Sequence, residues 1–218
     1  MTCHSAFLDK NGIELLEDHL RATLSWVRRL FISRRYHLRL ARILDVEEGT
    51  ARVALELSAL VHDLGKGVER YQTSRTGFRG HEYFSAFLAT RSLRLPEQIV
   101  ASVGLAILLH HHTMQQRDPP RGRHRLSEEC VKTFLRLADS EGLADLLDPQ
   151  PLRAEFTTKD VIAEAKRLKT SGRVNPLPAL ALLYPLVIAD NLAASARGGG
   201  RTVLLNEIIQ SYVLRGPL

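Results

Sequence analysis

Apolar residues recur along most of this chain at spacings of three and four, which is the period of an amphipathic α-helix. No stretch shows the alternation typical of a β-strand, and no repeat or linker divides the chain. We therefore expect a single all-α domain, a helical bundle over residues 1–218. The expected helices cover 13–44 (two helices or one bent one), 52–64, a short stretch from 81, 96–112, a stretch capped by Ser127, 159–168, 180–196 and 203–214.

The helix over 52–64 has the most informative ending, because its apolar stripe leads into His62, Asp63, Gly65 and Lys66. Gly65 is expected to end the helix in a left-handed conformation. An ionised Asp63 in a buried last turn would be costly unless a positive group held it, and a metal ion is one such group. Asp63 could then bridge two metals. The alternative is a surface ion pair with Lys66.

Composition places the chain among ordinary globular proteins, with 218 residues, 44% hydrophobic and 25% charged. The net charge is +6 and most of the cations are arginine, which suits phosphate contacts or simply a solvated surface. Aromatic content of 6% argues against extensive base stacking. We see no membrane span or signal peptide, and Cys3 and Cys130 do not suggest a disulfide framework. A cytoplasmic location fits.

Candidate metal ligands are spread over five predicted helical segments, and each taken alone is ordinary. Jointly, imidazoles and carboxylates on several helices are what a bundle needs to build a dinuclear centre in its core. Mixed nitrogen and oxygen donors suit Fe, Mn, Co, Ni or Zn better than calcium. The candidates are His19, His62 with Asp63, His81, the run His110, His111 and His112, and Asp190, which is nearly alone in an apolar helix.

In order and spacing, this set resembles the HD superfamily of metal-dependent phosphohydrolases. Within it, the match is closest to the stand-alone HD nuclease subunit of type I CRISPR interference. The matching features span about 16–195, most of the chain. They are Leu-Glu-Asp-His-Leu ending at Leu20, His-Asp-Leu-Gly-Lys ending at Lys66, Gly-His-Glu at 80–82 followed by Ser85, the histidines after Leu109, and Ile-Ala-Asp-Asn-Leu-Ala-Ala-Ser ending at Ser195.

The resemblance implies two divalent metal ions (Mn, Ni, Co, Fe or Mg). The first would be held by His19, His62, Asp63 and Asp190, and the second by Asp63, His81 and two of the three consecutive histidines. We favour His110 and His111, because the apolar run 107–109 abuts them, and keep His112 as the alternative. His4 and His37 compete with His19, and we expect both at the surface.

The implied activity is cleavage of single-stranded DNA, with RNA as an open alternative, using Asp63 and Lys66 as catalytic residues. The family works beside a separate helicase and a crRNA-guided surveillance complex, and no membrane contact is expected. Arginines in the loops near the histidines are predicted to bind the nucleic acid. They are Arg70, Arg75, Arg79, Arg117, Arg121, Arg123, Arg125, Arg197 and Arg201.

Two other functions stay open. One is an HD phosphohydrolase acting on nucleotides or cyclic nucleotides, which the basic composition disfavours without excluding. The other is a non-catalytic, nucleic-acid-binding subunit with a degenerate HD core, which the full ligand set argues against.

Overall fold

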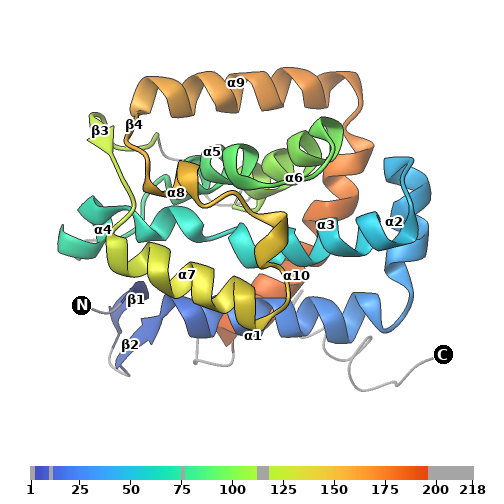
Figure 1. The fold of residues 1–218 in the computed structure, drawn as a ribbon, viewed down its shortest axis with the longest axis horizontal. Coiled ribbons are helices and arrows are strands. Elements are labelled where there is room, and N and C mark those ends of the chain that lie inside the picture. The colour runs from blue at the N-terminus through green and yellow to red at the C-terminus, as the bar shows by residue number, and fades with distance from the viewer. Residues whose placement is uncertain (1–2, 10–11, 75–76, 112–117, 196–218) are drawn as a thin grey trace.

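The computed structural model describes residues 3–9, 12–74, 77–111 and 118–195, which form a bundle of helices (Figure 1). This confirms the expected all-α class. The α-helices are α1 (Leu16–Val27), α2 (Tyr36–Leu44), α3 (Glu48–Val61), α4 (Glu69–Ser74), α5 (His81–Ser92), α6 (Glu97–Leu109), α7 (Glu128–Ser140), α8 (Gln150–Arg153), α9 (Thr158–Val174) and α10 (Leu177–Ser195). Short turns of other helix types are η1 (Arg28–Ile32), η2 (Leu64–Gly67) and η3 (Ala144–Leu146).

Helix α3 runs through the centre of the molecule (Figure 1). Every residue from Ala54 to Val61 is buried, so its second half is enclosed on all faces rather than along one stripe. It packs against α1, α2, α6 and α10. The end of α3, where His62 and Asp63 lie, is therefore inside the bundle.

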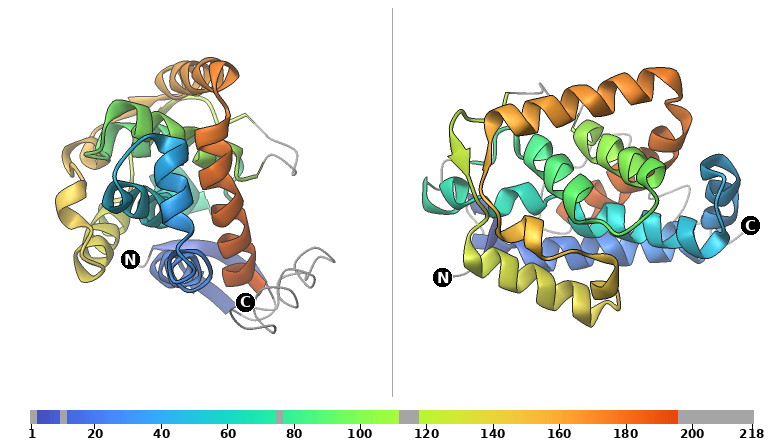
Figure 2. Two further views of the ribbon diagram at one scale, coloured as in Figure 1. Left: turned by 90° about the vertical axis from the view of Figure 1, so that its right-hand side faces the viewer. Right: turned by 45° about the horizontal axis from the view of Figure 1, so that its top comes forward.

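Helix α10 is the second core element. Figure 2 shows that it runs from the end of α9 to α1, on which it packs. Its length and mean hydropathy of 1.6 would by themselves allow it to cross a membrane, although no membrane span was expected from the sequence. More than half of it, 56%, is buried against the other helices, as expected for a core helix. This packing brings Asp190 to the end of α3.

Two predictions about the chain around α3 are wrong. The helix ends at Val61, and Gly65 lies in the 3-10 turn η2 without a left-handed backbone. Its need for glycine is steric, because a Cβ atom there would lie 2.3 Å from the carbonyl oxygen of His81. The stretch after it, expected as a loop to Gly80, contains α4.

Within the described ranges the chain also forms four short strands, where the sequence indicated none. Strands β1 (His4–Asp9) and β2 (Gly12–Leu15) form an antiparallel hairpin that leads directly into α1, and β3 (Arg123–His124) pairs with β4 (Phe156–Thr157). Strands of two to six residues, one of them with register shifts, are too short to show a clear alternation.

Cys3 and Cys130 form a disulfide, contrary to expectation. The bond joins the residue before β1 to α7, with a sequence separation of 127 between the two cysteines and 5.0 Å between their Cα atoms. Both cysteines are buried. The N-terminal hairpin is thus covalently tied to the body of the bundle.

Candidate metal centre

The centre is built around the end of α3. His62 is the residue that follows the last turn, and Asp63 leaves the helix with φ −108° and ψ 10°. Their side chains are 0% and 1% exposed. Lys66, one turn of η2 later, places its Nζ 2.6 Å from Oδ2 of Asp63. Asp63 therefore does pair with Lys66, but in the interior and not as a surface ion pair.

Three of the histidines are oriented in the same way by their own backbone. Each ring donates its Nδ1–H to the carbonyl oxygen three residues earlier, because a carbonyl can only accept. These bonds run from His62 to Ala59 (2.8 Å), from His81 to Phe78 (2.7 Å) and from His110 to Ile107 (2.5 Å). In the neutral ring the lone pair is then on Nε2, the atom that can bind a metal.

The Nε2 atoms converge on Asp63, whose two oxygens face different histidines. Oδ1 lies 2.9 Å from Nε2 of His81 and 3.7 Å from Nε2 of His110. Oδ2 lies 3.1 Å from Nε2 of His19 and 3.5 Å from Nε2 of His62. This division is the arrangement expected of a carboxylate that bridges two positions.

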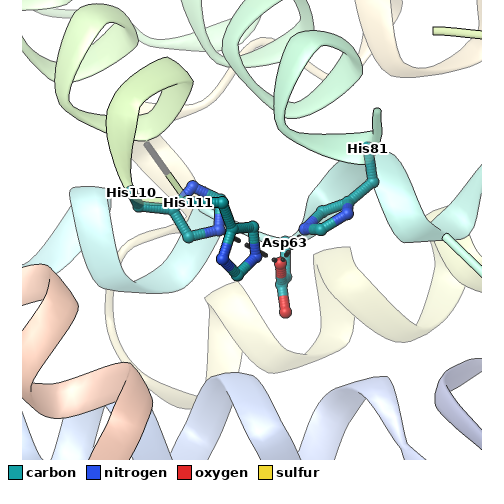
Figure 3. Close-up of side chains that lie close together, drawn as sticks. All are labelled: Asp63, His81, His110 and His111. Atoms are coloured by element: carbon teal, nitrogen blue, oxygen red, sulfur yellow. Dashed lines mark ion pairs between the residues drawn. The ribbon is translucent and has the colours of Figure 1, made fainter. Parts of the chain in front are cut away.

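The donor atoms form two groups, and within each group all of them lie within 4.8 Å of one another. The first ligand group is His19, His62, Asp63 and Asp190, and the second ligand group is Asp63, His81, His110 and His111. Asp190 completes the first through Oδ1, which is 3.0 Å from Nε2 of His19. Figure 3 shows the second, with Asp63 between His81 on one side and the two consecutive histidines on the other.

Charge in the centre is balanced between carboxylates and histidines. Burial raises the pKa of Asp63, but Lys66 and His62 outweigh it and hold that pKa well below its usual range. Burial lowers the pKa of His81, and burial together with His110 and His81 lowers the pKa of His111 to about 2. Both of these rings are therefore neutral near pH 7, as metal ligands must be.

His19 and His110 differ from them. Burial opposes protonation of His19, but hydrogen bonding to Asp190 and Asp63 raises its pKa to about 9. Burial likewise opposes protonation of His110, and Asp63 raises its pKa. Asp63 and Asp190 thus favour positive charge on the histidines around them, and the same negative potential would favour a bound cation.

The polar atoms of the centre are placed to bind a metal ion rather than to form hydrogen bonds with one another. Within the described structure, the buried Nε2 atoms of His62, His81 and His110 and Oδ1 of Asp63 lack a hydrogen-bond partner. Nε2 of His81 nevertheless approaches Oδ1 at 2.9 Å. Two acceptors at that distance repel unless a cation lies between them. The nitrogen and oxygen donor set suits a first-row transition metal.

Every ligand proposed from the sequence that lies in a described part of the chain is in one of the two groups. His112 lies outside the described residues. Of the competitors for His19, His37 is half-buried on α2, outside both groups. His4 was expected at the surface, and this was wrong, because the residue is only 8% exposed. Its backbone is paired with the side chain of Gln72.

The predicted nucleic-acid contacts are only partly described. Arg75, Arg117, Arg197 and Arg201 lie outside the described residues. Exposed side chains belong to Arg70, Arg79, Arg121, Arg123 and Arg125. Arg125 forms a two-pronged ion pair with Glu69, at 2.8 and 3.1 Å, and Arg70 reaches the carbonyl oxygen of Arg121.

Three residues support the centre in roles that were not predicted, and only Ser85 among them had been noted as part of a motif. Ser85 accepts a hydrogen bond from the backbone N–H of Gly65, and the side chain of Gln72 donates to the carbonyl oxygen of Lys66. Glu14, on β2, faces Nδ1 of His19. The role of Ser85 could have been predicted, because it lies four residues after His81 and so on the same helix face. The other two act across the fold and leave no local pattern.

Comparison with known proteins gives the class. The HD domain family matches residues 34–148, more than half of the chain, and the chain therefore belongs to the HD family. HD domains are generally metal-dependent phosphohydrolases, in keeping with the clustered histidines and aspartates.

A solved structure similar to this chain is the CRISPR-associated Cas3 HD domain protein from Methanocaldococcus jannaschii. The two are 18% identical with a TM-score of 0.49, over 83% of this chain and 94% of the other. A likeness this weak adds nothing to the family assignment. No curated protein sequence matches the chain.

Proposed function

We propose that this HD protein is a metal-dependent nuclease that hydrolyses phosphodiester bonds in single-stranded DNA, with RNA to be tested beside it. The observation that carries the proposal is the shared Asp63, whose two oxygens face two separate ligand groups. Two-metal centres are a recurrent solution for phosphodiester cleavage. When bound, two divalent ions would polarise the scissile phosphate and activate a water molecule.

The residues of the chain supply orientation and charge. The Nδ1 bonds to backbone carbonyls fix the rings of His62, His81 and His110 before any ligand arrives. Lys66 has its Nζ beside Asp63, and its side chain is 15% exposed. It can therefore donate a hydrogen bond to a non-bridging phosphate oxygen at the edge of the centre.

A polymer substrate is supported by the arginines. A groove of about 630 Å³ is lined by residues of α4 and of the segment before α7, among them Arg70, Arg123 and Arg125. Glu69 and Glu155 also line it, so a bound strand would compete with Glu69 for Arg125. A groove with three guanidinium groups suits successive phosphates better than one mononucleotide.

We propose CRISPR interference as the setting, with a separate helicase subunit and a crRNA-guided complex as partners. The ordered motif set supports this. Adding a purified CRISPR helicase from the same genome should increase DNA degradation by this protein. No stimulation and no co-purification would remove these partners while leaving the nuclease proposal intact.

The nuclease proposal is tested with labelled oligonucleotides and Mn, Ni, Co or Mg. We expect single-stranded DNA to be cut faster than duplex, EDTA to abolish cleavage, and Asp63→Ala to be inactive. His37→Ala is the matched control and should cleave like the wild type. Metal-loaded protein that hydrolyses mononucleotides or cyclic dinucleotides but leaves polymers intact would refute it.

The groove is tested by charge removal. The double variant Arg70→Gln, Arg123→Gln should weaken binding to any single strand and reduce the slope of log K against log salt by about 0.7 per lost phosphate contact. Arg39→Gln, an exposed arginine on α2, is the control and should not change the slope. An unchanged slope in the double variant would show that the strand passes elsewhere.

A further inference from the structure

The N-terminal hairpin contacts the back of the metal centre. Oε1 of Glu14, on β2, lies 3.7 Å from Nδ1 of His19, the ring atom opposite the one that faces Asp63 and Asp190. His19 is 1% and Glu14 is 14% exposed, so solvent screens this contact only weakly. In His62, His81 and His110 the Nδ1 atom bonds to a neutral backbone carbonyl.

Glu14 is itself held from the opposite side. Ser5, a buried residue of β1, donates its hydroxyl to Oε2 of Glu14. The backbone keeps these partners together, because Glu14 pairs with Ala6 across the hairpin and Leu16 N–H donates to the carbonyl oxygen of Cys3 at 3.0 Å. The disulfide at Cys3 then ties this end of the hairpin to α7. One carboxylate oxygen is thus fixed while the other faces the imidazole.

A carboxylate behind a histidine changes the histidine as a ligand. At 3.7 Å the contact is electrostatic rather than a hydrogen bond, and its negative charge favours the tautomer with the proton on Nδ1 and makes Nε2 a better electron donor. Losing such an outer partner typically lowers metal affinity by about 10- to 100-fold. The effect is local to the metal that the histidine binds.

We propose that Glu14 is a positioning residue for the first ligand group, acting through His19, with Ser5 holding Glu14 in place. The inference rests on the metal centre of the proposed function and does not depend on the substrate. It predicts an asymmetry, because only the first ligand group contains His19. The second ligand group should keep its affinity when Glu14 is changed.

The test compares Glu14→Gln and Glu14→Ala with a control on the same surface, Glu17→Gln. Glu17 is three residues later and pairs with Arg21 and Arg136 at the surface of α1. Metal-free protein is titrated with Mn²⁺ and with Co²⁺, and the metal bound per chain is measured after dialysis. We expect two ions in the wild type and in Glu17→Gln. In Glu14→Gln one ion should bind as before and the other about 10-fold more weakly.

Further measurements separate positioning from folding. Thermal unfolding of the metal-free Glu14→Gln variant should match that of the wild type, and the visible absorption of its weaker Co²⁺ site should be altered. Affinity should fall in the order wild type, Glu14→Gln, Glu14→Ala, and Ser5→Ala should resemble Glu14→Gln.

Two wild-type affinities in Glu14→Gln would overturn the inference. Equal weakening of both sites, with a lower melting temperature, would do the same by showing a merely structural role. A wild-type chain that binds no metal at all would instead overturn the proposed function, and Glu14 would lose its role with it.

Discussion

Asp63 is the residue common to both ligand groups, with one oxygen facing each. Asp63→Ala should therefore remove most of the bound metal and all cleavage, because a two-metal mechanism needs both ions. His81→Ala should empty mainly the second position and leave some metal with little activity. Metal analysis beside the DNA assay distinguishes these outcomes. Full cleavage by Asp63→Ala would refute the assignment of the centre.

The control for these variants should be His37, which lies outside both groups. His4 was also expected at the surface, but it is not suitable as a control variant. It is buried, and its backbone holds Gln72, which in turn holds the Lys66 carbonyl. Loss of activity in a folded, metal-loaded His37→Ala variant would contradict the placement of α2 away from the chemistry.

Lys66 competes with a metal for Asp63, since its Nζ is 2.6 Å from Oδ2. Lys66→Gln removes a positive charge next to the centre, so metal content should stay equal or rise while kcat falls by about 100-fold. A matched loss of metal and activity would show that Lys66 only maintains the structure of the site. Equilibrium dialysis and single-turnover cleavage measure the two quantities separately.

At the scale of elements, the close contact of η2 with α5 fixes where Asp63 and His81 meet. Gly65→Ala should destabilise the protein by about 1–3 kcal/mol, because the new Cβ would press on the backbone of His81 and Ser85. Gly49→Ala is the matched control, since nothing lies within 4 Å of a Cβ there and alanine favours the helix. Urea unfolding of the metal-free proteins measures both. Equal stability of the two variants would mean that η2 and α5 are not so close.

The elements also show what the sequence could and could not predict. Asp190 was found because a carboxylate is rare in a helix that is apolar on most faces, and the pair His62–Asp63 because it follows a buried apolar stripe. The hairpin was missed because its strands are too short for a periodic signal. Glu14 could therefore not be placed, since its position opposite His19 depends on that hairpin. Glycine at position 65 was expected to end the helix in a left-handed conformation. The structure instead requires glycine there because η2 passes close to the backbone of α5.

At the scale of the whole molecule, the disulfide is the feature with the largest expected effect on stability. Cys3 and Cys130 are the only cysteines, and they close a loop of 127 residues. Removing such a link typically costs about 2–5 kcal/mol through the entropy of the unfolded chain. Cys130→Ser, or reduction with dithiothreitol, should lower the urea midpoint accordingly. Two reactive thiols in the unreduced, denatured wild type would show that the bond does not form.

The cysteine pairing was also beyond the sequence analysis. Two cysteines far apart in a chain carry no signal of contact, and composition alone favoured separate thiols. The antiparallel hairpin folds the start of the chain back to the first residue of α1, which packs on α7. What could be predicted was thus the chemistry concentrated in helices, and what could not was the covalent and polar support that distant segments provide.

The position of Asp190 on α10 has a consequence for how the protein is made. The second ligand group is complete in the chain by His111, but the first waits for a residue about 80 positions later. At a synthesis rate of about 5–20 residues per second, that delay amounts to several seconds. Because α10 is also a core helix that packs on α1, α3 and α6, the nascent bundle cannot close before Asp190 has emerged. A chain truncated between these positions would lack both a core helix and one of its candidate ligands. Completion of the metal centre is therefore tied to completion of the polypeptide.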